Sequence, residues 1–482
     1  MIDIKYMKIP EILKSDILLI NCPNWEPRWP NMGLGYISEI CRQNQYSVSF
    51  LDINRILLNN ASIEEREYWQ SYNWHIWWSL DLFEKWYRIF KIRINEITKK
   101  IIDSNNKLIG FSVTRQSWML SVILAEDLKK NISDCTIIFG GYDCQFTDEC
   151  YEKYKNKYID YIFIDEAEET IIEFLKEYNN GNNQKKIEEI PGILSLINPQ
   201  KYQKRNWVSD IDKLPFPKYL EFNFEDYPDK LSLMIMGSRC CSWAKCTICP
   251  DTNRGGFFRT RSAENIFDEI KYHYENNNID DFVFGDAEIN GKPEILDELC
   301  GRIIDSGIKI KLGGQLRVNS EVEISTYQKM KKAGFNILLV GLESASPDII
   351  KRMNKGFKIE DAVLMFKKMK AADLIVAVNL IVGLPGESLK NFYETVDFIK
   401  TNRYIIDHVE ELNTCMVYKK CKLGEKHKTF KVYNTDDEYG WFCKDGNTIT
   451  ERRRRLTLLS NVIDEMKYDR GYKWKKYDSK IV

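Results

Sequence analysis

The feature that most constrains this chain is a repeated alternation of short apolar runs and helical stretches. Five runs in the first third are rich in Ile, Val and Phe and end at turn residues: 16–23, 47–53, 107–114, 135–141 and 160–165. Such runs are typical of strands buried on both faces, and segments with helical spacing or length separate them. The pattern predicts a parallel sheet covered by helices, a Rossmann-like α/β domain.

A second series of strands and helices begins near residue 232. Its apolar runs are 233–238, 281–286, 309–314, 336–344, 375–385 and 408–417, and Ser262 is the expected N-cap of an intervening helix. Six strands with crossover helices predict a partial (β/α)6 barrel, whose functional groups should lie at the C-terminal strand ends. We therefore expect the Rossmann-like domain at 1–185, a linker at 186–231, the barrel at 232–417 and a small mixed α/β cap at 418–482.

Charge and cysteine content exclude several classes of protein. The 482 residues include 70 Lys and Arg against 71 Asp and Glu, so the net charge of -1 provides no global field for nucleic acid or an anionic membrane. We find neither a signal peptide nor an apolar stretch of about 18 residues. Thirteen cysteines are an uneven number for a disulfide set. These observations predict a cytoplasmic protein without nucleic-acid or membrane partners, whose cysteines bind metal or react.

The segment MGSRCCSWAKCTICP carries the sharpest motif, at the end of the first barrel strand. Cys241, Cys246 and Cys249 form a C-x4-C-x2-C pattern, and three thiols in one loop can hold three irons of a [4Fe-4S] cluster while one iron stays open. Structural zinc would need a fourth protein ligand, and no histidine is close in sequence. Zinc or a coincidental grouping are the alternatives, and Cys240 offers a second pattern, C-x5-C-x2-C.

This segment resembles the cluster loop of the radical SAM superfamily, which opens with Ser-Arg-Gly-Cys. Ser238, Arg239 and Cys241 match that stretch, and Cys240 stands in the usual glycine position, which favours Cys241 as the ligand. The spacing is one residue longer than the commoner C-x3-C-x2-C, and Ile248 replaces the usual aromatic residue. The resemblance continues through FRTRSAENIFDEI, FGDAEIN, GGQLRV, GLESASPDIIKRMNKG and IVGLPGES, and so covers about 235–400.

The resemblance implies a binding site for S-adenosylmethionine at the strand ends. The residues that it places against the methionine, ribose or adenine are Asp286, Arg317, Glu343, Ser344 and Asn379. It also implies that Gly383, Pro385 and Gly386 shape the adenine side. Carboxylates suit ribose hydroxyls and an amino group, and a guanidinium suits a carboxylate. The alternative is that several of these residues serve only the structure of the barrel.

Two ligands compete for the first domain. Gly33, Gly35 and Ser38 nearly spell the dinucleotide fingerprint, and Asp52 ends the second strand where a ribose-binding acid would lie. However, the loop CPNWEPRWPNM is too long for that tight turn, and the third glycine is missing. The segment PNMGLGYISEICRQNQYSVSFLDIN, with GFSVT, IIFGGYD and DEAEET, instead resembles the cobalamin-binding domain fused to many radical SAM enzymes.

That second resemblance implies a corrinoid site built from small residues and carboxylates. It places Ser112 and Thr114 at the nucleotide tail, Gly140 and Gly141 where the corrinoid approaches the backbone, and Glu166 and Glu168 where the site closes. The D-x-H-x-x-G motif is absent, so the cobalamin is expected base-off without a histidine ligand. The alternative is a cobalamin-like domain that has lost its cofactor.

Four other motifs are interpreted structurally. The tryptophans of a helical insertion are expected in the core: Trp69, Trp74, Trp77, Trp78 and Trp86. GDAEINGKP lacks the spacing of a phosphate loop. The RRRR run at 452–455 is predicted to be the solvated face of a C-terminal helix, with acidic-peptide binding as the alternative. Cys415, Cys421 and Cys443 are predicted to be free thiols rather than ligands of a second cluster.

Together the two resemblances imply a cobalamin-dependent radical SAM methyltransferase that depends on Cys241, Cys246 and Cys249. In that family, an electron from a flavodoxin- or ferredoxin-type donor enters the cluster and cleaves S-adenosylmethionine. The 5'-deoxyadenosyl radical takes hydrogen from an unactivated carbon of a peptide or small natural product, methylcobalamin supplies the methyl group, and a second S-adenosylmethionine restores it. The alternatives are a non-methylating cyclase or rearrangement enzyme, a methylthiotransferase, which needs a second cluster, and a corrinoid or iron-sulfur sensor without turnover.

Overall fold

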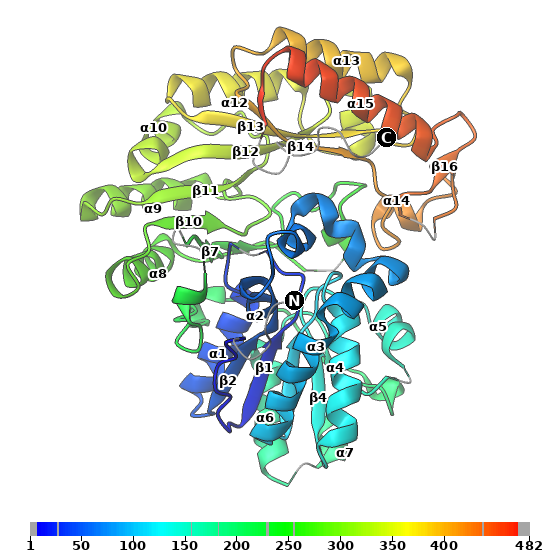
Figure 1. Ribbon diagram of the computed structural model, residues 1–482. Helices are drawn as coiled ribbons and strands as arrows, with labels where there is room; N and C mark the ends of the chain where they lie inside the picture. The colour runs from blue at the N-terminus through cyan, green and yellow to red at the C-terminus, as the bar shows by residue number, and fades with distance from the viewer. Residues whose placement is uncertain are drawn as a thin grey trace. The chain divides into compact units, whose positions relative to one another are not determined.

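The chain folds into two compact α/β units, residues 1–233 and 234–482 (Figure 1). The computed structural model describes residues 7–26, 28–155, 157–181, 183–227, 231–253, 256–435 and 438–470. Each unit is built on one mainly parallel sheet with helical crossovers. The predicted fold class is thereby confirmed.

The first unit contains a six-stranded sheet in the order β2-β1-β3-β4-β5-β6. Its strands are β1 (Ile17–Asn21), β2 (Val48–Asp52), β3 (Leu108–Ser112), β4 (Thr136–Gly140), β5 (Tyr161–Phe163) and β6 (Ile193–Ser195). All five predicted strands are present and run parallel, while β6 pairs antiparallel with β5. The segment 186–231, which the sequence analysis takes as a linker, thus contributes the last strand of this sheet.

Helices of the first unit cross over between its strands. They are α1 (Met32–Gln43), α2 (Ile53–Asn59), α3 (Leu80–Ser104), α4 (Trp118–Asn131), α5 (Thr147–Tyr154), α6 (Glu168–Asn179) and α7 (Gln184–Ile187). The helix α1 packs against α6, and α3 packs against α4. The strand order places β1 beside both β2 and β3, and such a switch point is where doubly wound folds bind ligands.

The tryptophan-rich insertion lies in two short 3-10 helices, η2 (Glu65–Trp69) and η3 (Ser71–Trp77), and in the start of α3. Trp69, Trp77 and Trp86 are buried and pack on one another, with 4.7 Å between the ring centroids of Trp77 and Trp86. The other two tryptophans, Trp74 and Trp78, are half-buried. The predicted core role is confirmed for the first three.

The second unit contains a seven-stranded sheet in the order β7-β10-β11-β12-β13-β14-β17. Its strands are β7 (Leu233–Ile235), β10 (Asp281–Phe284), β11 (Lys311–Leu316), β12 (Phe335–Glu343), β13 (Ile375–Val382), β14 (His408–Thr414) and β17 (Asp469–Arg470). The six predicted strands lie side by side in chain order, as a partial (β/α) barrel requires. The short strand β17 adds to β14 in parallel.

Helices connect consecutive strands of the second unit: α8 (Ala263–Asn276), α9 (Pro293–Ser306), α10 (Ile324–Ala333), α11 (Pro347–Met353), α12 (Ile359–Ala371) and α13 (Leu389–Thr401). The Ser262 side chain accepts a hydrogen bond from the Asn265 backbone N–H, so the predicted N-cap of α8 is confirmed. The cap holds α14 (Lys422–Glu425), the antiparallel pair β15 (Val432–Tyr433) and β16 (Phe442–Cys443), and α15 (Ile449–Glu465).

The prediction that the RRRR run is a solvated helix face is wrong for two of its four residues. Arg452 and Arg455 in α15 are 0% and 5% exposed. The Arg452 guanidinium lies 3.7 Å from the centre of the Trp441 ring and donates to the Trp441 carbonyl, while Arg455 pairs with the buried Glu387 at 2.7 Å. Arginine is buried here because partners distant in sequence satisfy it.

None of the described helices is both long enough and apolar enough to cross a bilayer.

Candidate functional site

The three motif cysteines lie in the loop between two short paired strands, β8 (Ser238–Arg239) and β9 (Arg259–Thr260), directly after β7. Cys240 adopts a φ of 62°, the left-handed region that favours glycine. This explains why glycine is usual at that position of the family motif. The Cys240 thiol faces the Arg259 guanidinium at 3.8 Å.

The thiols of Cys241, Cys246 and Cys249 share one environment. Burial raises the pKa of all three, to about 12 for Cys249, and the charges of Cys246 and Cys241 contribute to the rise at Cys249. Lys355 and Arg317 act in the opposite direction on Cys246. The structure therefore brings together the three predicted ligands, and metal binding must displace their protons.

No group of three or more Cys, His, Asp or Glu side chains within the described ranges is arranged to hold a single metal ion. A [4Fe-4S] cluster is held by Cys thiolates, and three of them leave one iron without a protein ligand. The donor set of three neighbouring thiols thus fits a cluster with one open iron.

A turn between α11 and α12 holds the cysteine loop from one side. The Trp243 indole donates to the Asn354 carbonyl at 2.6 Å, and the Asn354 side chain donates to the Lys245 carbonyl at 2.9 Å. Thr247 donates through its backbone to the Met353 carbonyl. A Cβ on Gly356 would lie 2.2 Å from the Trp243 ring, so only glycine permits this contact. Sequence analysis missed this turn, although it ends the segment GLESASPDIIKRMNKG.

The cap holds the same loop through α14. The Leu423 backbone N–H donates to the Thr247 carbonyl at 2.8 Å, and the Lys422 ammonium donates to the Lys245 carbonyl at 3.5 Å. Cys421, Cys415 and Cys443 lie buried in the apolar cluster beneath, against which Ile248 packs. The loop that carries the three thiols is thus ordered by backbone hydrogen bonds on two sides.

Two buried carboxylates lie beneath the loop. Asp286 accepts hydrogen bonds from the Gly237 N–H at 2.9 Å and from the Ser238 hydroxyl, and burial raises its pKa to about 7. Glu288 accepts from the Ser242 N–H at 2.5 Å, and sequence analysis did not assign it a role. These carboxylates tie β10 to the start of the cysteine loop.

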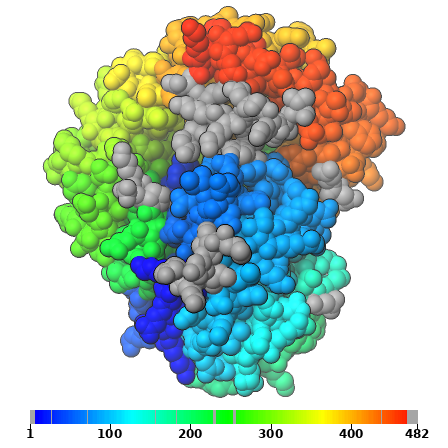
Figure 2. Space-filling model, in the orientation of Figure 1, coloured from blue at the N-terminus to red at the C-terminus, as the bar shows by residue number. Residues whose placement is uncertain are grey.

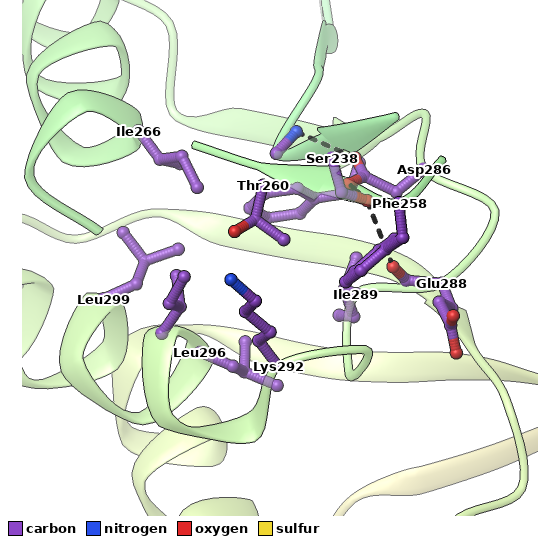
Figure 3. A pocket seen from close by; sticks show the side chains of 13 residues that line it. Ser238, Phe258, Thr260, Ile266, Asp286, Glu288, Ile289, Lys292, Leu296 and Leu299 are labelled. Carbon is purple, nitrogen blue, oxygen red and sulfur yellow. Dashed lines mark hydrogen bonds between the residues drawn. The ribbon is translucent and has the colours of Figure 1, made fainter. Parts of the chain in front are cut away.

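A cavity of about 30 Å³ lies next to Asp286, with Lys292 and Thr260 facing each other across it (Figure 3). This volume is enough for about one water molecule and far below that of a ligand pocket. In this structure the cavity is therefore too small to hold S-adenosylmethionine.

Two of the other predicted contacts leave polar atoms without partners among the described residues: Arg317 Nε and Asn379 Oδ1. The rest of the Arg317 guanidinium is fixed, because it donates to the Lys355 carbonyl at 2.6 Å and lies 4.7 Å from the centre of the Trp243 ring. Buried polar atoms normally have partners. An orphaned donor and an orphaned acceptor fit a polar ligand such as S-adenosylmethionine.

Glu343 and Ser344, at the end of β12, already have partners within the protein. The Glu343 carboxylate pairs with the Lys355 ammonium at 3.2 Å. The buried Ser344 hydroxyl lies 3.0 Å from the Thr395 hydroxyl. Their predicted contacts with S-adenosylmethionine stay predictions.

The Gly383–Glu387 loop after β13 is packed by arginines. A Cβ on Gly383 would lie 2.3 Å from the Arg452 side chain, and one on Gly386 would lie 2.8 Å from the Arg352 guanidinium. The buried Pro385 lies between them. The Gly383 N–H donates to the Glu387 carboxylate, and Asn447 donates to the Gly383 and Leu384 carbonyls. The cap therefore shapes the loop that is expected to contact adenine.

In the first unit, Ser112 ends β3 at the switch point. Its hydroxyl accepts a hydrogen bond from the Asn31 side chain at 3.2 Å, and Asn31 also caps α1 at Leu34. Thr114 follows in the next loop, where its backbone N–H donates to the Ser117 hydroxyl. Gly140 ends the neighbouring strand β4, and a Cβ there would come no closer than 3.7 Å to the Phe163 side chain.

Two of the remaining predicted corrinoid contacts, Gly141 and Glu166, are used by the protein itself. Gly141, with a φ of 109°, leaves room for the Val113 backbone, whose oxygen would lie 2.9 Å from a Cβ. The Glu166 carboxylate accepts from the Val208 N–H at 2.9 Å. Glu168 lines a surface hollow of about 340 Å³ beside α1 and α6. The structure thus brings Ser112, Thr114, Gly140 and Gly141 together after β3 and β4.

Two amides that sequence analysis missed have orphaned atoms in loops after the strands. Asn24 Oδ1 follows β1 and Gln145 Nε2 follows β4, and neither has a hydrogen-bond partner in the part of the chain that the structure describes. These orphaned atoms fit a polar ligand at this edge of the sheet. No spacing rule could have found them, because their lack of partners is a tertiary property.

The geometry around Asp52 agrees with the rejection of a dinucleotide site. The Asp52 carboxylate accepts from the Asn21 side chain at 3.0 Å, the Arg55 N–H at 3.0 Å and the Tyr227 hydroxyl at 2.8 Å. Burial raises the pKa of this carboxyl. Asp52 is thus occupied by protein donors rather than available to a ribose.

Comparison with known sequences identifies the second unit. Residues 235–399 match the Radical SAM superfamily. The chain is 26% identical over 319 residues to an uncharacterized methyltransferase of Pyrococcus horikoshii, covering 64% of this chain and 67% of that protein. It is 23% identical over 414 residues to the 4'-phospho-dehydrooxetanocin synthase of Priestia megaterium, covering 76% of this chain and 54% of that one. The chain thus spans between half and about two thirds of these relatives.

Comparison with solved structures identifies the combination of the two units. The cobalamin-dependent radical enzyme OxsB, solved with aqua-cobalamin and S-adenosylmethionine, gives a TM-score of 0.62 at 18% identity and covers 94% of this chain and 61% of its own. The methyltransferase TsrM of Kitasatospora setae, solved with cobalamin and a [4Fe-4S] cluster, gives 0.63 at 14% identity and covers 85% and 74%. Residues 235–399 thus match the radical SAM superfamily, and the chain shares the fold of the solved cobalamin-dependent radical SAM proteins OxsB and TsrM.

Proposed function

We propose that this enzyme binds a [4Fe-4S] cluster, S-adenosylmethionine and base-off cobalamin, and methylates an unactivated carbon of a peptide or small natural product. The observation that carries the proposal is the ordered loop in which Cys241, Cys246 and Cys249 share one environment at the end of the first barrel strand. The similarity to TsrM and to the Pyrococcus methyltransferase favours methyl transfer.

In this proposal the cofactors would supply the difficult chemistry. The cluster would provide the electron that splits S-adenosylmethionine, and cobalamin would provide the methyl group. The protein supplies position. Cys241, Cys246 and Cys249 hold the cluster, while Asp286 and the Arg352–Gly356 turn hold their loop in place. Arg317 Nε and Asn379 Oδ1 are the groups that can still bind a substrate carboxylate and a donor.

The first unit would hold cobalamin at the ends of β1, β3 and β4. Ser112, Thr114 and Gly140 lie there, and Asn24 and Gln145 offer an acceptor and a donor for its amide side chains. None of the four histidines occupies a D-x-H-x-x-G motif. Such a loop would therefore supply no histidine to bound cobalamin.

The test is a metal and product analysis of protein purified anaerobically from cells supplied with cobalamin. We expect about four irons and about one cobalt per chain, with iron lost and cobalt kept when Cys241, Cys246 and Cys249 are all replaced by Ala. Iron without cobalt would contradict the cobalamin part of the proposal. Multiple turnovers with any acceptor would eliminate the alternative of a sensor that binds its cofactors without turnover.

A second candidate, a non-methylating rearrangement or cyclisation, is favoured by the similarity to the dehydrooxetanocin synthase and to OxsB. The two candidates differ in their products from S-adenosylmethionine. Methylation predicts equal amounts of adenosylhomocysteine and 5'-deoxyadenosine. Product formation without adenosylhomocysteine would establish the second candidate.

A further inference from the structure

A strong local excess of positive charge surrounds the cysteine loop, although the whole chain is nearly neutral. Three segments contribute to it: 243–253 in the loop itself, 347–358 around the turn after α11, and 418–431 around α14. They contain eleven Lys and Arg residues against the three acidic residues Asp251, Asp348 and Glu425. We call these three segments the basic surface.

The three segments touch one another. Asn354 and Lys422 donate to the Lys245 carbonyl, and Leu423 donates to the Thr247 carbonyl. Their positive charges therefore lie around one stretch of loop rather than being scattered over the barrel. A net excess of eight charges in so small a region creates a field that the total charge of -1 conceals.

Most of these cations face solvent. The exposed ones are Lys245, Lys351, Arg352, Lys358, Lys419, Lys426, Lys428 and Lys431. The orange part of the chain in Figure 2, to which α14 belongs, reaches the surface of the face shown. The other three, Lys355, Lys420 and Lys422, are half-buried, and Lys355 pairs with Glu343 at 3.2 Å.

Two neighbouring loops of the barrel do not share this excess of positive charge. The loops after β10 and β11 carry Asp286, Glu288, Glu321 and Glu323 against only Lys292 and Arg317. A general attraction to anionic substrate would need no such asymmetry. The excess follows instead the segments that hydrogen-bond the backbone of the cysteine loop.

We propose that the basic surface is the docking site of an acidic one-electron carrier protein of the flavodoxin class. This inference rests on the proposed function, because it assigns the entry point of the electron that the cluster needs. The carrier loses one electron and the cluster takes it up, with no other atom transferred. Weak redox encounters use small interfaces steered by complementary charge, and a basic rim beside the thiols provides this.

The test compares two reductants in a charge-reversal variant. The variant K351E/K426E/K428E changes exposed lysines that hold neither the cysteines nor S-adenosylmethionine. The matched control K309E/K332E/K400E changes three exposed lysines near the opposite, amino ends of the strands. We measure S-adenosylmethionine cleavage driven by a reduced acidic flavodoxin and by dithionite, and flavodoxin affinity by titration calorimetry.

At low ionic strength we expect flavodoxin-driven cleavage and flavodoxin affinity to fall about tenfold in the first variant only. Dithionite-driven cleavage should match the wild type in both variants. Added salt should weaken the wild-type complex and reduce the difference.

Three results for the K351E/K426E/K428E variant would overturn the docking proposal. The first is an unchanged affinity for flavodoxin, and the second is a loss of S-adenosylmethionine cleavage that is as large with dithionite as with flavodoxin. The third, from a separate binding assay with poly(U) RNA, is a loss of RNA binding while flavodoxin binding persists. The last result would assign the surface to nucleic acid. If the wild type cleaves no S-adenosylmethionine even with dithionite, the proposed function fails, whereas the calorimetric result still decides the docking site.

Discussion

At the scale of single residues, Asp286 shows how burial raises the pKa of a carboxyl group. Its carboxylate receives two hydrogen bonds, which favour ionisation, yet desolvation has the larger effect and raises the pKa to about 7. The unfolded chain should titrate near pH 4. The folded protein therefore binds the extra proton between about pH 4 and pH 7, and its free energy of unfolding falls as the pH rises through this window.

We expect the substitution Asp286→Asn to remove that contribution. The wild-type free energy of unfolding should decline relative to that of D286N by up to about 4 kcal/mol between pH 4 and pH 7, because one pKa unit corresponds to about 1.4 kcal/mol. Urea unfolding at several pH values, followed by barrel-specific hydrogen exchange, measures the difference. A difference that does not change with pH would show that Asp286 is ionised throughout.

Cys240 and Cys241 make a matched pair of neighbouring thiols. Cys240→Gly should keep the full iron content and raise stability by about 1 kcal/mol, because glycine adopts the left-handed backbone without strain. Cys241→Gly should lose iron. Iron analysis and thermal unfolding of both variants test this, and loss of iron only in C240G would reverse the assignment of the ligand.

At the scale of elements, helix α15 supports a loop of the barrel. Arg455 donates to the Glu387 side chain and backbone at 2.7 and 2.9 Å, and Glu387 in turn accepts from the Gly383 N–H. Both side chains of this pair are buried. Removing one partner of a buried pair leaves an uncompensated charge, which costs about 3–5 kcal/mol.

We therefore expect Arg455→Met to destabilise the second unit by about 3–5 kcal/mol and to weaken S-adenosylmethionine binding. The double variant R455M/E387Q should recover much of the stability, since no charge is then left unpaired. The neighbouring exposed Arg454 is the control, and Arg454→Met should leave the melting temperature unchanged. Calorimetry and equilibrium binding measure both effects; equal melting temperatures for R455M and R454M would refute the role of the pair.

Sequence patterns predicted the regular elements well. The predicted runs contain β1 to β5, and the barrel strands deviate from their predicted bounds by a few residues. The patterns missed β6 and β17, which have three and two residues and owe their extended pairing to partners elsewhere. They also placed Arg452 and Arg455 in solvent, because charge alone does not reveal that Trp441, Gly383 and Glu387 converge on them.

At the scale of the whole molecule, the chain divides into two units with separate cores. The core of the first unit extends from β1 through the tryptophan insertion to β6 and contains Trp77, Trp86 and Phe90. The second unit has its own packing, in which the cluster around Trp441 joins the barrel to the cap. The motifs of the candidate site follow this division: the cysteines lie in one unit, and the residues proposed to hold cobalamin lie in the other.

Separate cores predict two unfolding transitions. The substitution Trp77→Ala should cost about 3–5 kcal/mol and lower only the transition of the first unit, because it leaves a cavity against Trp86. Ile63→Ala is the control, since Ile63 is 82% exposed. Differential scanning calorimetry, with iron content as a marker of the second unit, distinguishes the transitions. A single transition that shifts as a whole would indicate that the units unfold together.

The contact between Gly383 and Arg452 limits how the cap of this protein can be exchanged for that of a related protein. Because the arginine side chain occupies the space where any side chain at position 383 would begin, the two positions are linked although 69 residues of sequence separate them. A chimera that exchanges the cap at residue 418 would break this link unless the incoming helix also presents an arginine there. An exchange of the cap must therefore preserve the positions that support the Gly383–Glu387 loop.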